Sequence, residues 1–132
     1  METLKDIFVS YEIAQKLKEI GFDEKCIASY TSAKNIIFEL YDLTRHAFKE
    51  DLIINDFNSS DRCISAPTWE QVKKWFREKG IESSLFTEDG YYYYRGSKGD
   101  KFLFSGTEDT YEQAREALIL KLIEIYKNEQ DI

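Results

Sequence analysis

Thr68-Trp69-Glu70-Gln71-Val72 sets the architecture of this chain, because it marks the start of a helix and occurs in two further versions. Each version has a hydroxyl residue, an aromatic residue, a glutamate and, two residues later, a small apolar residue. The hydroxyl caps the first turn, and in the two later versions a Gln at the third helical position completes a capping box. The other two versions are Ser10-Tyr11-Glu12-Ile13-Ala14 and Thr110-Tyr111-Glu112-Gln113-Ala114.

Apolar residues at helical spacing follow each of these starts, so the sequence predicts three helices. Gly21 supplies a left-handed residue that ends the first, and Phe22 is expected to close on Leu17 in a Schellman motif. Gly80 ends the second, whose large aromatic residues are expected in the core. The predicted helices are Ser10–Ile20, Trp69–Lys79 and Tyr111–Asn128.

After Gly80 the apolar period changes to two, which is typical of strands. Turn residues divide this part of the chain twice, so the pattern predicts a three-stranded antiparallel meander. Phe102 and Phe104 are expected on the same side of it. The predicted strands are Ile81–Thr87, Tyr91–Arg95 and Lys101–Ser105, with turns at Glu88–Gly90 and Gly96–Asp100.

The segment between the first two helices is harder to assign. Ile27–Tyr30 is predicted as a short strand, and Ile36–Leu43 as a second strand. A helix over Ser32–Phe48 is the alternative, because its apolar residues also match the helical period. The polar stretch Asn55–Arg62 is predicted as an exposed loop.

These elements predict an α+β fold in which three helices pack on one face of an antiparallel sheet, in the order α-β-β-α-β-β-β-α. The 132 residues suit a single domain, 1–132, with one core. No apolar run is long enough to cross a bilayer, so we expect no contact with a membrane. Cys26 and Cys63 are too few for a disulfide framework, and no signal peptide opens the chain, so a cytoplasmic location is expected.

The charge pattern bears on partners. The chain has 18 basic and 25 acidic residues, a net charge of −7, which opposes binding to nucleic acid. The acidic excess is uneven along the chain. Acidic residues outnumber basic ones in residues 1–66 and 106–132 but not in residues 67–105. Any acidic partner would therefore approach that part of the chain.

The run Tyr91-Tyr92-Tyr93-Tyr94 gives the main candidate surface. Alternation along a strand sends two of the tyrosines to each face, so one pair must leave the helix-covered face. Tyr offers a large, stiff contact area, and neighbouring basic groups attract anions. The alternative is that cross-strand aromatic pairs only stabilise the sheet. The predicted surface contains Tyr92, Tyr94, Arg95, Lys98 and Lys101.

The last helix has an apolar stripe that is wider than one sheet face usually needs. Leu120 falls on its polar side, and Ile123 widens the stripe. We therefore predict these two residues as a second candidate surface, and a homodimer through residues 111–128.

No catalytic pattern stands out. Gly96-Ser97-Lys98-Gly99 resembles a phosphate loop, but it lacks the full glycine spacing and precedes a strand, so a hairpin turn is the better interpretation. His46 is the single histidine, which leaves no histidine pair for a metal. We therefore predict no catalytic, cofactor or metal site, and a protein that is not an enzyme.

Several of these motifs occur together in a known family. Gly21-Phe22-Asp23-Glu24-Lys25-Cys26, Ala66-Pro67-Thr68-Trp69-Glu70-Gln71 and Tyr111-Glu112-Gln113-Ala114-Arg115-Glu116 resemble the pattern of short proteins found in phage and prophage-bearing gut bacterial genomes. The match leaves Thr31–Arg62 largely unmatched. The resemblance implies a small cytoplasmic protein of mobile-element origin, and it assigns no reaction.

Two functional hypotheses follow. The first is a non-enzymatic interaction module of phage or prophage origin that contacts a protein partner, whose identity the sequence does not give. The second is a nucleic-acid-associated regulator in which a basic patch gathers beside the tyrosines of the 91–105 hairpin. That patch would contain Lys73, Lys74, Arg77, Arg95, Lys98 and Lys101.

Overall fold

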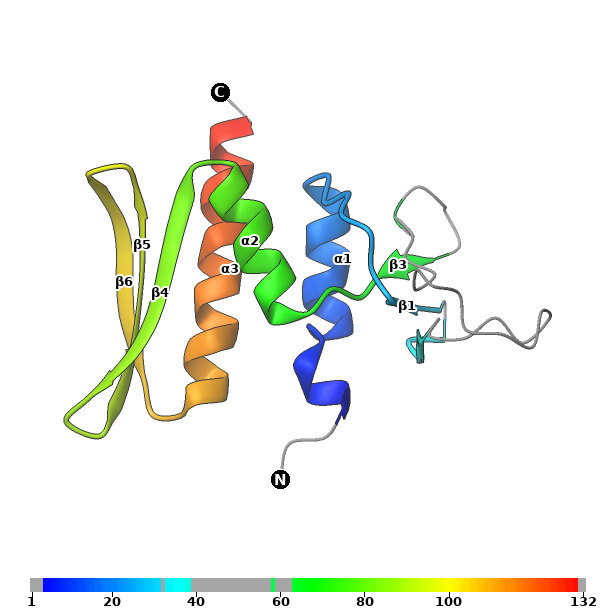
Figure 1. Ribbon diagram of the computed structural model, residues 1–132, viewed down its shortest axis with the longest axis horizontal. Coiled ribbons are helices and arrows are strands. Elements are labelled where there is room, and N and C mark those ends of the chain that lie inside the picture. Colours follow the sequence, from blue (N-terminus) through cyan, green and yellow to red (C-terminus); the bar gives the residue numbers. More distant parts are fainter. Residues whose placement is uncertain (1–3, 32, 39–57, 59–62, 131–132) are drawn as a thin grey trace, which may run out of the picture. The chain divides into compact units, whose positions relative to one another are not determined.

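The computed structural model describes residues 4–31, 33–38, 58 and 63–130 (Figure 1). The chain divides into two compact units, Met1–Gln71 and Val72–Ile132, each with a three-stranded antiparallel sheet. A single domain over residues 1–132 stays a prediction.

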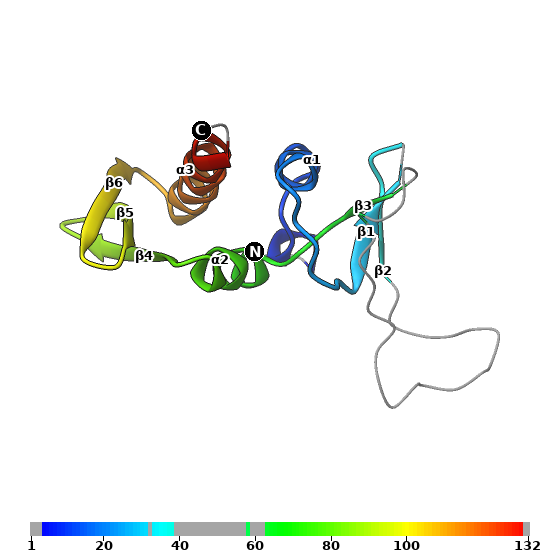
Figure 2. The same ribbon diagram turned by 90° about the horizontal axis from the view of Figure 1, so that it is seen from above.

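The first unit contains a 3-10 helix, η1 (Leu4–Ile7), helix α1 (Tyr11–Glu19) and three short strands, seen from above in Figure 2. The strands are β1 (Ala28–Tyr30), β2 (Ile36–Phe38) and β3 (Ile64–Ser65), in the sheet order β2-β1-β3. Tyr30 lies opposite both Ile36 and Ile64. The strand prediction is therefore confirmed for Ile36–Phe38 against the helical alternative, whereas its continuation to residue 43 lies outside the described residues.

Helix α1 begins and ends as its sequence predicts. The Ser10 side-chain oxygen accepts a hydrogen bond from the backbone N–H of Ile13, at 3.3 Å. At the other end Gly21 has a φ of 92°, and the N–H of Phe22 donates to the carbonyl of Leu17 at 3.0 Å. This is the Schellman motif, and the Phe22 side chain is buried.

Side chains join the short strands to the rest of the first unit. Asn58 is half-buried, donates to the carbonyl of Phe22 and accepts from the N–H of Ser65, each at 2.9 Å. The prediction that Asn55–Arg62 is an exposed loop is therefore wrong at Asn58, because its half-buried amide connects two backbone segments. The other residues of that loop lie outside the part of the chain that the structure describes.

Tyr30 provides a testable contact in this unit. Its hydroxyl donates to the carbonyl of buried Val9 at 2.6 Å, and burial, with a smaller effect from the Glu12 carboxylate, raises the pKa of that hydroxyl. Tyr30→Phe is expected to lower the free energy of unfolding by about 1 kcal/mol at pH 7, since it leaves a buried carbonyl without its donor.

A raised pKa also makes stability depend on pH. Above about pH 10, an unfolded tyrosine loses its proton while folded Tyr30 keeps it, so the free energy of unfolding falls as pH rises. Urea titrations between neutral pH and pH 11 should show that the free energy of unfolding falls less with pH in Tyr30→Phe than in the natural chain. Tyr91→Phe, at a half-exposed site, is the matched control. An unchanged slope in Tyr30→Phe would contradict this assignment.

Helix α2 (Trp69–Glu78) begins with the predicted capping box. The N–H of Gln71 donates to the Thr68 hydroxyl at 3.1 Å, and the N–H of Thr68 donates to the Gln71 side chain at 3.0 Å. Gly80 follows the helix with a φ of 91°. The prediction of core positions is confirmed for four apolar residues, namely Trp69, Val72, Trp75 and Phe76.

The second unit contains the predicted meander and the last helix. The strands are β4 (Ile81–Glu88), β5 (Tyr91–Lys98) and β6 (Lys101–Glu108), followed by α3 (Tyr111–Gln130), which packs against the sheet (Figures 1 and 2). Each strand is longer than predicted. Gly96–Lys98 pairs with β4 instead of forming a turn, so the second turn shrinks to two residues, Gly99 and Asp100.

The α+β class and the order of the predicted elements are confirmed, with β3 as an additional two-residue strand. The described strands form two sheets instead of one, because β1 to β3 pair with each other and β4 to β6 pair separately. Among the described residues, no helix is both long enough and apolar enough to cross a membrane.

Candidate interaction surface

A two-residue turn fixes which residues share a face of the β4-β5-β6 sheet. Asp89 and Gly90 both have positive φ values, 52° and 83°, as a type I′ hairpin requires. Glu88 therefore lies opposite Tyr91, and the ladder continues to Leu85 opposite Tyr94. Since side chains alternate along each strand, Tyr92 and Tyr94 share one face, and Tyr91 and Tyr93 share the other.

Helix α3 covers the face that carries Tyr92 and Tyr94. The Tyr92 ring meets the ring of Tyr111, the first residue of α3, edge-on with centroids 6.2 Å apart. Near the other end of α3, the Lys98 ammonium lies 3.4 Å from the Glu129 carboxylate. We call this the inner face of the sheet and the opposite one the outer face.

Two aromatic rings on the inner face cover glycines of the neighbouring strands. Tyr94 of β5 lies opposite Gly106 of β6, and Phe104 of β6 lies opposite Gly96 of β5. A Cβ at either glycine would overlap the opposing ring. Both rings are only 8% exposed, and their centroids are 6.3 Å apart. The glycines thus let both rings lie flat against the sheet, beneath α3.

This geometry separates the residues that the sequence analysis grouped as one surface. Tyr92 and Tyr94 were expected to leave the helix-covered face, but Tyr92 is half-buried and Tyr94 is buried on the inner face. Lys98 lies on the inner face, and Lys101 lies opposite it. Arg95 is therefore the one member of the predicted group that faces outward.

The second candidate surface, on α3, is also largely buried. Ile123 is 5% exposed and Leu120 is half-buried. Most of the wide apolar stripe is buried within the chain, including Leu118, Ile119 and Leu122. The surplus apolar surface that suggested a dimer is therefore largely absent, and a homodimer through residues 111–128 stays a prediction.

The outer face instead exposes aromatic residues that the sequence analysis did not single out. Phe86 of β4 and Tyr93 of β5 are cross-strand partners whose rings stack, with centroids 5.5 Å apart and planes 12° from parallel. Phe86 is 43% exposed, and Tyr91, at the end of the same face, is 50% exposed. These are large apolar surfaces in contact with water.

An irregularity in β6 adds a third ring to the outer face. Ser97 pairs with Phe102 while the adjacent Gly96 pairs with Phe104, so β6 has one extra residue, Leu103, at this point. Such a bulge reverses the alternation of side chains. The prediction that Phe102 and Phe104 share a side is therefore wrong, because Phe104 is buried under α3 and Phe102 is 56% exposed.

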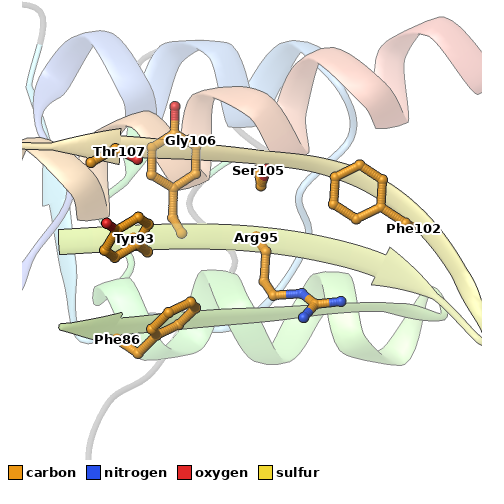
Figure 3. A pocket seen from close by; sticks show the side chains of 8 residues that line it. Phe86, Tyr93, Arg95, Phe102, Ser105, Gly106 and Thr107 are labelled. Atoms are coloured by element: carbon orange, nitrogen blue, oxygen red, sulfur yellow. The ribbon is translucent and has the colours of Figure 1, made fainter. Parts of the chain in front are cut away.

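The rings of Phe86, Tyr93 and Phe102 border a hollow of about 480 Å³ on the outer face. Figure 3 shows Phe86 and Tyr93 at one end of this hollow, Phe102 at the other, and Arg95 between them. Arg95 is exposed, and no ion pair or hydrogen bond holds its guanidinium among the residues that the structure describes. Ser105, Gly106, Thr107 and Tyr94 complete the lining, so Arg95 is its one charged residue.

The basic patch of the second hypothesis does not collect around this hollow. Lys73, Lys74 and Arg77 belong to α2, where the Lys74 ammonium lies 3.9 Å from the Glu78 carboxylate. Of the six cations in that patch, only Arg95 lines the hollow.

Reactive groups are few in the described part of the chain. It contains no group of three or more His, Cys, Asp or Glu side chains placed to hold a metal ion. Cys26 is buried and Cys63 is half-buried, and the two do not form a disulfide. His46 lies outside the described residues. Of the four residues that resembled a phosphate loop, Gly96, Ser97 and Lys98 lie within β5 and only Gly99 lies in the hairpin turn.

The chain matches no protein-family model, and comparisons with curated proteins and with solved structures also find no similar protein. The resemblance to phage and prophage proteins therefore stays a prediction from the sequence motifs.

Proposed function

We propose that this protein is a non-enzymatic interaction module, cytoplasmic and of phage or prophage origin, that binds a protein partner through the outer face of the β4-β5-β6 sheet. The observation that supports this function is the hollow in which Phe86, Tyr93 and Phe102 surround Arg95. Aromatic residues and arginine are enriched at the centres of protein interfaces, where they contribute most of the binding energy.

Sheet stability does not account for all of these exposed rings. The stacking of Phe86 on Tyr93 stabilises the pairing of β4 with β5. Phe102, however, has Ser97 as its cross-strand neighbour, and within the described residues its ring stacks on no other ring. The bulge turns this ring toward water, and burying it against a partner would stabilise a complex.

The charge of the outer face favours a protein over a nucleic acid. Affinity for nucleic acid comes largely from several cations that neutralise successive phosphates. The hollow has one cation, and the outer face also carries Glu82 and Glu88 at its two ends. A polyanion would meet these carboxylates, so we propose a protein partner.

Paired substitutions test this function. The double variant Phe86→Ser and Phe102→Ser is expected to reduce partner capture from the native cell at least about tenfold, since two exposed anchor side chains are removed. Ile7→Ser with Ile37→Ser is the matched control, because these exposed apolar residues lie in the first unit. Capture should be measured with tagged proteins at equal concentration, after circular dichroism shows that both variants are folded.

Equal capture by the natural chain and the outer-face variant would contradict the proposal, as would loss of capture in the control. A fluorescent oligothymidine provides the test for the second hypothesis. If it binds at low salt, weakens steeply with added salt and requires Phe86 and Phe102, the outer face binds nucleic acid instead.

A further inference from the structure

The strand register arranges the side chains of the outer face in parallel rows, and three of these rows border the hollow. The central row contains Arg95 with Ser84 and Ser105 on either side, so a charged group lies between two hydroxyls. Each flanking row contains one exposed ring, Phe86 in one row and Phe102 in the other. One row is Phe86-Tyr93-Thr107, and the other is Glu82-Ser97-Phe102.

The distance between these rows matches the repeat of an extended chain. Residues two apart on a strand are about 6.6 to 6.8 Å apart, and this is also the spacing of side chains on one face of an extended peptide. A peptide that lies along β5 can therefore place three successive same-side residues, i, i+2 and i+4, over the three rows. The first and third would meet rings, and the second would meet Arg95.

The charges of this face select the middle residue of such a peptide. A guanidinium binds a carboxylate through two parallel hydrogen bonds, and Arg95 is the one charged residue that lines the hollow. Glu88 and Glu82 lie at the ends of the face, where they would repel further carboxylates. One acidic residue at the centre, with apolar residues at both sides, is the complement of this pattern.

On the basis of the proposed function, we infer that the partner docks through an extended segment with the pattern apolar-x-acidic-x-apolar. The carboxylate binds Arg95, one apolar side chain packs on Phe86 and Tyr93, and the other packs on Phe102. Ser84 and Ser105 offer hydroxyls beside the carboxylate.

Synthetic peptides test this inference by fluorescence anisotropy and by NMR titration of the full chain. The probe has the core Phe-Ser-Glu-Ser-Phe between Gly-Ser flanks, and a permuted peptide has the core Phe-Glu-Ser-Ser-Phe, which moves the carboxylate to the other side of an extended chain. We expect the probe to bind about tenfold more tightly than the permuted peptide, the change that an exposed charge-assisted pair can supply.

Variants of the protein locate the carboxylate. Arg95→Gln is expected to weaken binding of the probe about tenfold, whereas Arg77→Gln, the same change at an exposed arginine of α2, leaves it unchanged. Arg95→Glu should bind a Phe-Ser-Lys-Ser-Phe peptide more tightly than the probe, because the charges are exchanged. NMR shifts should be largest at Tyr93, Arg95 and Phe102.

Equal affinities for the probe and the permuted peptide, or an unchanged affinity in Arg95→Gln, would overturn the inferred pattern. If the probe fails to bind but partner capture still requires Phe86 and Phe102, the pattern is wrong and the proposed function stands. If oligothymidine binds in an Arg95-dependent way and the probe does not, both are overturned.

Discussion

Tyr94→Ala is expected to lower the free energy of unfolding by about 3 kcal/mol, the usual loss when a large buried aromatic side chain is truncated. The Tyr94 ring is 8% exposed, lies over Gly106 and lies near Phe104 beneath α3. Removing the ring leaves a cavity on the inner face. β5 and β6 cannot fill this cavity, because Gly96 and Gly106 have no side chains there. Urea unfolding at pH 7, followed by circular dichroism, measures this loss.

Tyr91→Ala is the matched control for this prediction. It removes the same side chain from the same strand, but Tyr91 is 50% exposed on the outer face. A substitution at such a site usually changes the free energy of unfolding by less than about 0.5 kcal/mol. We expect a loss near the top of that range, because alanine has a lower strand propensity than tyrosine. Similar losses in the two variants would contradict the assignment of inner and outer faces.

Gly96→Ala is expected to lower the free energy of unfolding by about 2 kcal/mol, even though alanine is not a poorer strand residue than glycine. A Cβ at this position would overlap the Phe104 ring, which is confined between the sheet and α3. Ser97→Ala, at the next position of β5, provides a control without such an overlap.

A double-mutant cycle identifies the cause of this loss. In a Phe104→Leu background the smaller side chain leaves room for the new methyl group, so Gly96→Ala should cost at least about 1 kcal/mol less than in the natural chain. Equal losses in both backgrounds would show that the ring is not what excludes alanine from position 96.

The helix boundaries were predictable because the signals are local. The Thr68 and Gln71 side chains that form a capping box lie three residues apart, and the glycines at 21 and 80 lie two residues after the last residue of their helices. Each of these contacts is made within about one turn of helix, so the order of the sequence contains the required information.

The exposed face of the sheet was assigned wrongly, although a local signal was present. Asp89-Gly90 is a strong two-residue hairpin signal, and it places Leu85 opposite Tyr94. Ile81 and Leu85 lie on the same, apolar side of β4. Because Leu85 lies opposite Tyr94, this register places Tyr94 in the core. Alternation along β5 alone does not distinguish the two faces, so the prediction placed Tyr92 and Tyr94 on the exposed face instead of Tyr91 and Tyr93.

Other features depend on contacts that no local pattern reveals. Gly96 resembled a turn residue, but its small size accommodates the Phe104 ring from another strand. The extra residue Leu103, which turns Phe102 outward, is defined only by the pairing of β5 with β6. Asn58 bonds to Phe22, 36 residues away. Such long-range packing determines most of the candidate site.

Hydroxyl-radical footprinting with and without the captured partner tests most directly whether the outer face is the docking surface. In the free protein, oxidation should be fast at exposed Phe86 and Phe102, slower at half-buried Tyr93 and slowest at buried Tyr94. With partner bound, the first three residues should become protected, while Tyr111, which is 39% exposed at the start of α3, keeps its rate. Protection at Tyr111 with unchanged oxidation of Phe86 and Phe102 would contradict the proposed surface.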